Sequence, residues 1–167
     1  MAHFEPKNAW ELYSTEIETE WTSFTSEVVP TYDQCWNTFY KLHIIGKEAG
    51  MLRSEARRAG TFGDSDMKNY RKRIGLRIVE LELDILYHYV KDFHAGRYFE
   101  FLRTIVEDPS TKWLERKNFG KVRNSNDFVL LSFIHFEAGR GNMSWGTAAD
   151  LEALKVALKS KGVPVKK

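Results

Sequence analysis

"DMKNYRKRIGLRIVELELDILYHYVKDFH", residues 66–94, is the stretch of sequence that decides the fold. Its apolar residues recur at intervals of three and four, as they do along an α-helix, and they form two stripes on different sides of that helix. One stripe holds Ile74, Ile78, Leu81, Ile85 and Tyr89, and the other holds Val79, Leu83, Leu86, Val90 and Phe93. A helix with two apolar sides needs neighbours on both. We therefore predict a long central helix at about 66–94 on which the other helices pack.

Helical spacing continues on both sides of this segment. Before it, the pattern predicts helices over about 8–24 and 31–59, which Pro30 separates and Gly60 ends. The second helix carries the stripe Cys35, Phe39, Leu42, Gly46 and Ala49. Its later members are small, so we expect another helix to cross closely there. After Gly96, helical spacing resumes around 98–105, and capping residues predict further helices over 108–120 and 147–162.

The stretch 127–138 is ambiguous. Its β-branched and aromatic residues suit a buried strand, whereas Asn126 and Gly139 suit the two ends of a helix. We favour the helix because no second strand is evident. The fold class that follows is all-α: a compact helical bundle of about six or seven helices around the central helix. A chain of 167 residues fits a single domain, 1–167, with a short basic C-terminal tail at 162–167.

Composition narrows the classes of function. Hydrophobic residues make up 43% of the chain and charged residues 29%, as in ordinary globular proteins. Cys35 is the single cysteine, which suits a reducing compartment, and we expect it to be a small buried side chain. The first residues lack the features of an export signal, and the most apolar run, 128–136, is shorter than the roughly 20 residues that cross a membrane. We expect a cytoplasmic protein without a membrane partner.

Charge is unevenly distributed along the chain. Residues 1–34 have a net charge of −6, residues 51–77 of +5 and residues 112–123 of +4, and five lysines follow between 155 and 167. Around the turn between the second and the central helix, we predict a positively charged surface that binds phosphates or an acidic protein. It consists of Arg53, Arg57, Arg58, Lys68, Arg71, Lys72, Arg73 and Arg77. Two simpler interpretations are a solvated surface and ion pairs with the acidic first helix.

Residues suited to catalysis or to metal binding are sparse. The Glu-x-x-His pattern of metal sites in helical bundles does not occur, and pairs such as Asp84 with His88 are weak ligand sets, so we predict no metal and no cofactor. Glu82 falls between the two apolar stripes, where we expect it to be partly buried and to pair with an Arg or a Tyr hydroxyl. His43 and His135 lie in apolar segments and are expected to be hydrogen-bonded core residues.

Aromatic residues outside the main stripes suggest contact surfaces. Trp113, Trp145 and Arg140 are candidate interface anchors, although Trp113 and Trp145 also suit packing under loops. We predict a non-enzymatic macromolecule-binding protein, a small nucleic-acid-associated or regulatory factor that uses the 53–77 hairpin. One alternative is an adaptor or inhibitor of a protein target, encoded by a phage or mobile element. Another is an unusual helical enzyme that uses Glu82 or His88. Oligomerisation is open.

Overall fold

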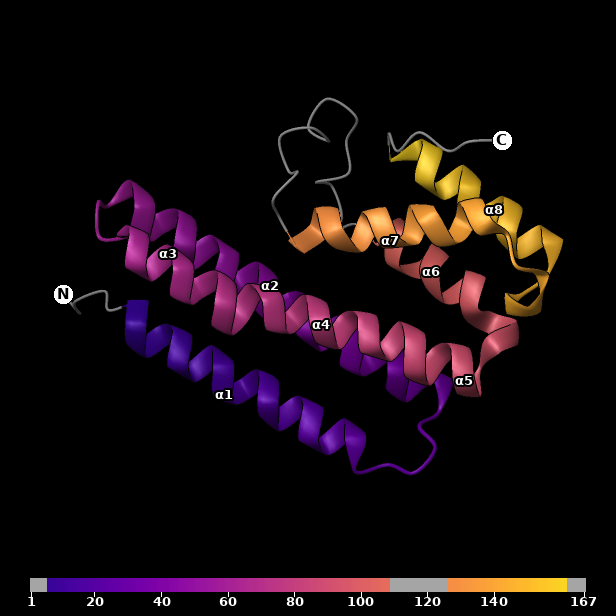
Figure 1. Ribbon diagram of the computed structural model, residues 1–167, viewed down its shortest axis with the longest axis horizontal. Helices are drawn as coiled ribbons and strands as arrows, with labels where there is room; N and C mark the ends of the chain where they lie inside the picture. Colours follow the sequence, from indigo (N-terminus) through magenta and orange to yellow (C-terminus); the bar gives the residue numbers. More distant parts are fainter. Residues whose placement is uncertain (1–5, 109–125, 162–167) are drawn as a thin grey trace. The chain divides into compact units, whose positions relative to one another are not determined.

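A computed structural model describes residues 6–108 and 126–161 of the chain (Figure 1). All regular secondary structure in these ranges is helical, which confirms the predicted all-α class. The chain divides into two compact units, an N-terminal unit, Met1–Glu82, and a C-terminal unit, Leu83–Lys167. The single-domain organisation stays a prediction, and each unit is described by itself.

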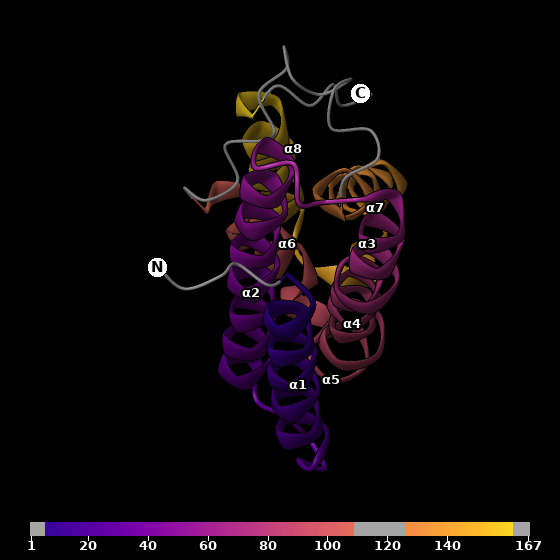
Figure 2. The ribbon, with the colours of Figure 1, turned by 90° about the vertical axis from the view of Figure 1, so that its left-hand side faces the viewer.

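Three helical rods form the N-terminal unit. They are α1 (Pro6–Thr25), α2 (Tyr32–Arg58), and a third rod made of α3 (Asp64–Tyr70), the π-helix η1 (Arg71–Gly75) and the first part of α4 (Leu76–Asp84). These rods lie side by side in both views (Figures 1 and 2). Trp10 of α1 lies beside Tyr70, and Glu18 of α1 binds Arg77, so α1 and the third rod run parallel and α2 runs opposite to both.

The core of the N-terminal unit forms where these rods meet. Ile17, Leu42 and Ile74, one from each rod, have no exposed surface, and a side chain of this kind contributes about 1.5–3 kcal/mol when buried. The predicted close crossing is confirmed at Gly46, because a Cβ atom there would lie 3.2 Å from Cδ1 of Ile78. The absence of a side chain at Gly46 therefore brings α2 and α4 together.

The ends of the helices follow their local sequence. The hydroxyl of Thr31 accepts a hydrogen bond from the Gln34 N–H while the Gln34 side chain accepts one from the Thr31 N–H, so α2 begins in a capping box. Gly60, with φ of +73°, follows the end of α2 in the left-handed conformation that glycine favours. The next helix begins two residues earlier than predicted, at Asp64, because the Asp66 carboxylate accepts a hydrogen bond from the Gly63 N–H.

The C-terminal unit consists of short turns and three longer helices. Its elements are the π-helix η2 (Ile85–Val90), α5 (Lys91–Phe93), the 3₁₀-helix η3 (Ala95–Arg97), α6 (Tyr98–Glu107), α7 (Asn126–Arg140), the 3₁₀-helix η6 (Met143–Trp145) and α8 (Ala148–Ser160). Helix α8 packs on α6 and α7, and the buried Leu102, Leu154 and Leu158 belong to this core. The choice of helix over strand for 127–138 is confirmed. The predicted cap at Thr147 is also confirmed, because its hydroxyl accepts a hydrogen bond from the Asp150 N–H.

The central helix has nearly the predicted extent but not a uniform geometry. Helical structure continues from Asp64 to Phe93, and η1 and η2 interrupt the α-helical hydrogen bonds with π-helical ones. A π-helical bond joins residues i and i+5 and encloses one residue more than an α-helical bond, so it turns the following side chains relative to those before it. Helical-wheel positions calculated at 100° per residue therefore drift along this segment.

Several predictions fall outside the described residues. They are the 108–120 helix beyond Asp108, the basic segment 112–123 with Trp113, and the tail at 162–167. Within the described ranges, no helix combines the length and the apolar character needed to span a membrane.

Candidate functional site

Six of the eight predicted cations form an exposed surface on the N-terminal unit. Arg57 and Arg58 end α2, and Lys68, Arg71, Lys72 and Arg73 lie on α3 and η1, which return beside it. We call these six residues the basic tip. All six side chains are exposed, and none forms an ion pair with any residue that the structure describes. The basic tip therefore presents its charge to solvent.

Arg53 supports the basic tip and is only partly exposed. Its guanidinium carbon lies 5.2 Å from the centre of the Tyr70 ring, and its Nη1 lies 3.9 Å from Sδ of Met67. A guanidinium over an aromatic ring gains about 0.5–2 kcal/mol. Arg53 therefore holds the end of α2 against α3, and its predicted role in binding stays a prediction.

An aromatic cluster fixes the same end of the unit. Trp10 is 5% exposed, and its ring meets Phe62 edge-on at 5.2 Å and Tyr70 at 6.1 Å between ring centres. Because Phe62 belongs to the turn between α2 and α3, the cluster ties all three rods together. The cations therefore stand on a well-packed support.

Arg77 differs from the other predicted cations because carboxylates of the same unit bind it. Its Nε donates to Glu18 at 2.6 Å, and its Nη1 donates to Glu80 at 2.7 Å. The hydrogen bond from Arg77 holds the pKa of Glu18 below its usual range and raises that of Arg77. Because its guanidinium already pairs with two carboxylates, we do not count Arg77 in the basic tip, and its predicted role in binding stays a prediction. The acidic first helix thus does pair with a basic residue at this edge.

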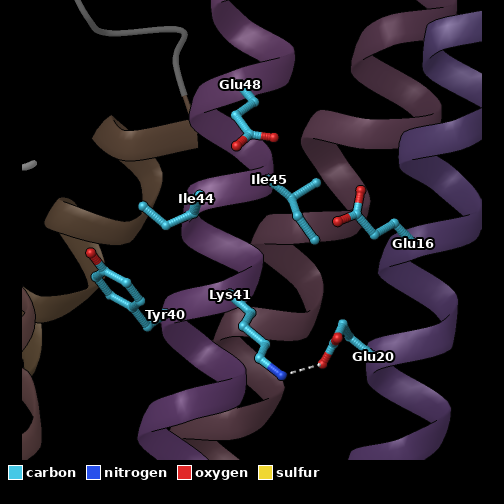
Figure 3. A pocket seen from close by; sticks show the side chains of 7 residues that line it. All are labelled: Glu16, Glu20, Tyr40, Lys41, Ile44, Ile45 and Glu48. Carbon is cyan, nitrogen blue, oxygen red and sulfur yellow. Dashed lines mark ion pairs between the residues drawn. The ribbon is translucent and has the colours of Figure 1, made fainter.

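A groove of about 340 Å³ runs between α1 and α2 (Figure 3). It is lined by Glu16 and Glu20 of α1 and by Tyr40, Lys41, Ile44, Ile45 and Glu48 of α2. The Nζ atom of Lys41 lies 3.5 Å from Oε2 of Glu20. Three carboxylates against one ammonium give the groove a negative charge. The i,i+4 spacing of Glu16 and Glu20 is visible in the sequence. The groove itself was not predictable, because it depends on which side of α2 faces α1.

Buried ionisable residues lie elsewhere in the N-terminal unit. Glu82 is 3% exposed, as expected, but its neighbour is His43 of α2, whose Nδ1 lies 3.9 Å from Oε2 of Glu82. The structure thus places a histidine near the Glu82 carboxylate, and the pairing with an Arg or a Tyr hydroxyl stays a prediction. Cys35 has no exposed surface, and burial raises the pKa of its thiol to about 11. The thiol stays protonated near neutral pH, which does not suit a nucleophile.

Trp145 and Arg140 belong to a packed cluster in the C-terminal unit. The Trp145 ring contacts Tyr98 at 5.3 Å and Phe99 at 6.4 Å between ring centres, and the Arg140 guanidinium lies 5.4 Å from it. These contacts fit the interpretation that Trp145 packs under a loop better than the interpretation that it is an interface anchor. Arg140 remains exposed at the edge of the cluster.

The two residues considered for catalysis, Glu82 and His88, differ in their surroundings. His88 is exposed, with Nε2 4.0 Å from Oδ1 of Asp84, while Glu82 is buried beside His43. Among the side chains that the structure describes, no group of three or more His, Cys, Asp and Glu residues could hold a metal ion. Comparison with protein-family models, with curated protein sequences and with solved structures finds no match to this chain.

Proposed function

We propose that the protein binds nucleic acid through the basic tip, by contacts to the phosphate backbone. One observation carries this proposal: two adjoining helix ends present six exposed cations that have no acidic partner within the described residues. Phosphates attract such cations, and each contact releases condensed counterions, which supplies most of the non-specific affinity for nucleic acid.

The surroundings of the basic tip also favour this function. The acidic groove on the α1–α2 side repels phosphates, so the N-terminal unit would approach a polyanion with the basic tip first. Arg71, Lys72 and Arg73 lie in a π-helix, a geometry that is frequent at functional sites. Flexible Lys and Arg side chains on helix ends suit contacts to the backbone, so we expect little dependence on base sequence.

The first experiment measures how binding depends on salt. Fluorescence anisotropy with a labelled 20-base-pair DNA duplex and with RNA of the same length would give the dissociation constant. If all six cations contact phosphates, affinity for the duplex falls about a thousandfold between 50 and 200 mM salt. Affinity that does not change with salt would contradict backbone contacts.

A second experiment assigns binding to the basic tip. Changing Arg57, Arg71 and Arg73 together to Glu should abolish binding and leave the helical circular dichroism intact. The matched control changes Arg97, Lys155 and Lys159 to Glu, which alters the net charge equally but leaves the basic tip in place. Equal loss in both variants would show that only net charge matters and would contradict the proposal.

A pull-down from cells with nuclease treatment separates the main alternative. Under the proposal, nuclease removes the co-purified material, and the basic tip variant recovers none. Recovery of one stoichiometric, nuclease-resistant protein that the basic tip variant fails to bind would instead identify an acidic protein as the partner.

A further inference from the structure

A cluster of aromatic rings in the C-terminal unit surrounds one ammonium group. The Nζ atom of Lys91 lies 3.8 Å from the centre of the Trp145 ring and 4.0 Å from that of the Tyr87 ring. The third ring, that of Tyr98, lies 5.0 Å away. The ammonium group also donates a hydrogen bond to Oε1 of Glu137 at 3.1 Å. We call these five residues the Lys91 cage.

The Lys91 cage is almost closed to solvent around its charges. The side chain of Lys91 is 8% exposed and that of Glu137 is 1% exposed. A buried ion pair recovers the cost of leaving water only when its remaining polar atoms are also satisfied. Within the described residues, Oε2 of Glu137 and the hydroxyl of Tyr98 are buried without a hydrogen-bond partner. The ammonium group of Lys91 therefore covers the faces of the rings but leaves Oε2 of Glu137 and the hydroxyl of Tyr98 without a hydrogen bond among the described residues.

The chemistry of the cage favours a particular class of ligand. Aromatic faces carry negative potential, and several of them around one centre recognise alkylated ammonium groups. Glu137 adds a hydrogen-bond acceptor, which suits an ammonium that keeps at least one N–H. Rings and carboxylate together suit a cation rather than the neutral amine that a nucleophilic lysine needs. A methylated ammonium would place methyl groups against the rings, where two N–H groups of Lys91 have no hydrogen-bond acceptor among the described residues.

Two walls of the cage reach the protein surface. Tyr87 is 44% exposed, and Trp145 is partly exposed on the short helix η6. The segment that carries Trp145 is flanked by Gly141 and Gly146, whose φ angles are +57° and +147°. Arg140, which is exposed, borders the Trp145 ring. A ligand can therefore approach the cage from the side of Tyr87 and Trp145.

We propose that the Lys91 cage binds a methylated ammonium group, and that Lys91 is an intramolecular ligand that occupies the cage until such a group replaces it. The exchange puts one cation in the place of another beside Glu137, so the charge inside the cage does not change. A dimethylated ammonium keeps one N–H for Glu137 and directs its methyl groups at the rings. This site is independent of the basic tip, which lies in the other unit.

The test uses the full chain and the protonated form of N,N-dimethylbutylamine as the probe. Two-dimensional NMR would follow the indole N–H of Trp145, identified as the signal that is missing in Trp145→Phe. We expect a saturable shift in the wild type. In Lys91→Ala the probe should bind at least about tenfold more tightly, because an occupant that fills the cage most of the time no longer competes. A neutral amide of similar size, N,N-dimethylbutyramide, should not bind.

Two further variants test the geometry. Lys91→Met fills the cage with an uncharged chain of similar length and should abolish binding. Trp145→Leu removes one ring, and a loss of about twofold to thirtyfold is expected, followed through the upfield shift of the probe's methyl protons. Equal binding of the amide, or no saturable response in the wild type, would overturn the proposal. If Lys91→Ala binds the probe but the wild type does not, Lys91 never leaves the cage. That result would overturn the proposed exchange of Lys91 for a methylated ammonium group. If Lys91→Ala does not fold, the wild-type titration decides.

Discussion

The basic tip and Lys91, one in each unit, lie in opposite environments. In the N-terminal unit the basic tip extends into solvent, whereas in the C-terminal unit Lys91 is enclosed by three rings and a carboxylate. Exposed ion pairs add only about 0–1 kcal/mol to stability each. The cations of the basic tip have no such partner among the described residues, but exposed charges supply the long-range attraction for charged partners. A buried pair adds little net stability, but removing one member leaves an uncompensated charge inside the protein. Under the two proposals, the same type of side chain serves attraction in one unit and close recognition in the other.

The largest expected effect comes from breaking the buried pair. Glu137→Gln keeps the shape of the side chain but leaves the ammonium of Lys91 inside the cage without its counter-charge. We expect the free energy of unfolding to fall by about 3–5 kcal/mol, measured by urea denaturation. A loss below about 1 kcal/mol is what a surface ion pair contributes. It would contradict the contrast between the buried pair of the C-terminal unit and the exposed charges of the N-terminal unit.

The same variant tests whether the two units unfold together. Cys35 is buried in the N-terminal unit, so a thiol reagent reaches it only after that unit opens. If the chain is one cooperative domain, Glu137→Gln should speed the labelling of Cys35 by about a hundredfold or more, matching its loss of stability. An unchanged labelling rate would show that the units unfold separately and would contradict the predicted single domain.

Two glycines provide a second comparison between the units. Gly46 faces Ile78 at close range, so Gly46→Leu should destabilise the protein by about 1–3 kcal/mol through overpacking. Gly139, near the end of α7, has open space around the position of a Cβ atom, so Gly139→Ala should stabilise it by about 0.5–1 kcal/mol. Thermal denaturation of both variants would measure the difference. The changes in stability of the two variants must have opposite signs. A Gly46→Leu variant that is more stable than the wild type would refute the close crossing of α2 and α4.

The smallest effect is expected at the ion pair of Glu18 with Arg77. The folded-state pKa of Glu18 is lowered, so its contribution to stability is present above the unfolded pKa of about 4.3 and is lost as pH falls through the lowered value. Because Glu18 is about half exposed, Glu18→Gln should cost less than about 1 kcal/mol at pH 7.

Urea denaturation of Glu18→Gln and wild type at pH 7 and at pH 2.5 would check this effect, with Glu100→Gln in the C-terminal unit as the matched control. Arg97 lowers the pKa of Glu100 through a similar exposed hydrogen bond, so the two variants should behave alike. A cost of Glu18→Gln that persists at pH 2.5 would mean that the pair acts by packing and not by charge.

Local features of the fold were predictable from the sequence. The cap at Thr147, the stop at Gly60 and the small residue Gly46 each act on their own segment or through a simple steric rule, and the structure confirms them. The exposure of the basic tip also followed from its pattern, because cations at the ends of two helices have few ways to be buried.

Contacts between segments far apart in the sequence were not predictable. Tyr87 and Lys91 of the Lys91 cage are four residues apart, but no spacing rule relates them to Tyr98, Glu137 and Trp145. The pairing of Arg77 with Glu18 and the proximity of His43 to Glu82 required the alignment of the rods, which helical-wheel positions do not give. The two π-helices also shift those positions, so the apolar stripes of 66–94 describe the covered sides only approximately.

The π-helices have a consequence for how this chain could change its length. Each widened turn of η1 and η2 already accommodates one residue more than α-helical bonding needs. Loss of one residue within such a turn could restore regular α-helical bonding while the flanking packing keeps its register, whereas the same deletion in α2 would rotate half of that helix away from its neighbours. The helical stretch from Asp64 to Phe93 therefore holds places where a codon deletion would disturb the packing of the helix less than the same deletion in α2.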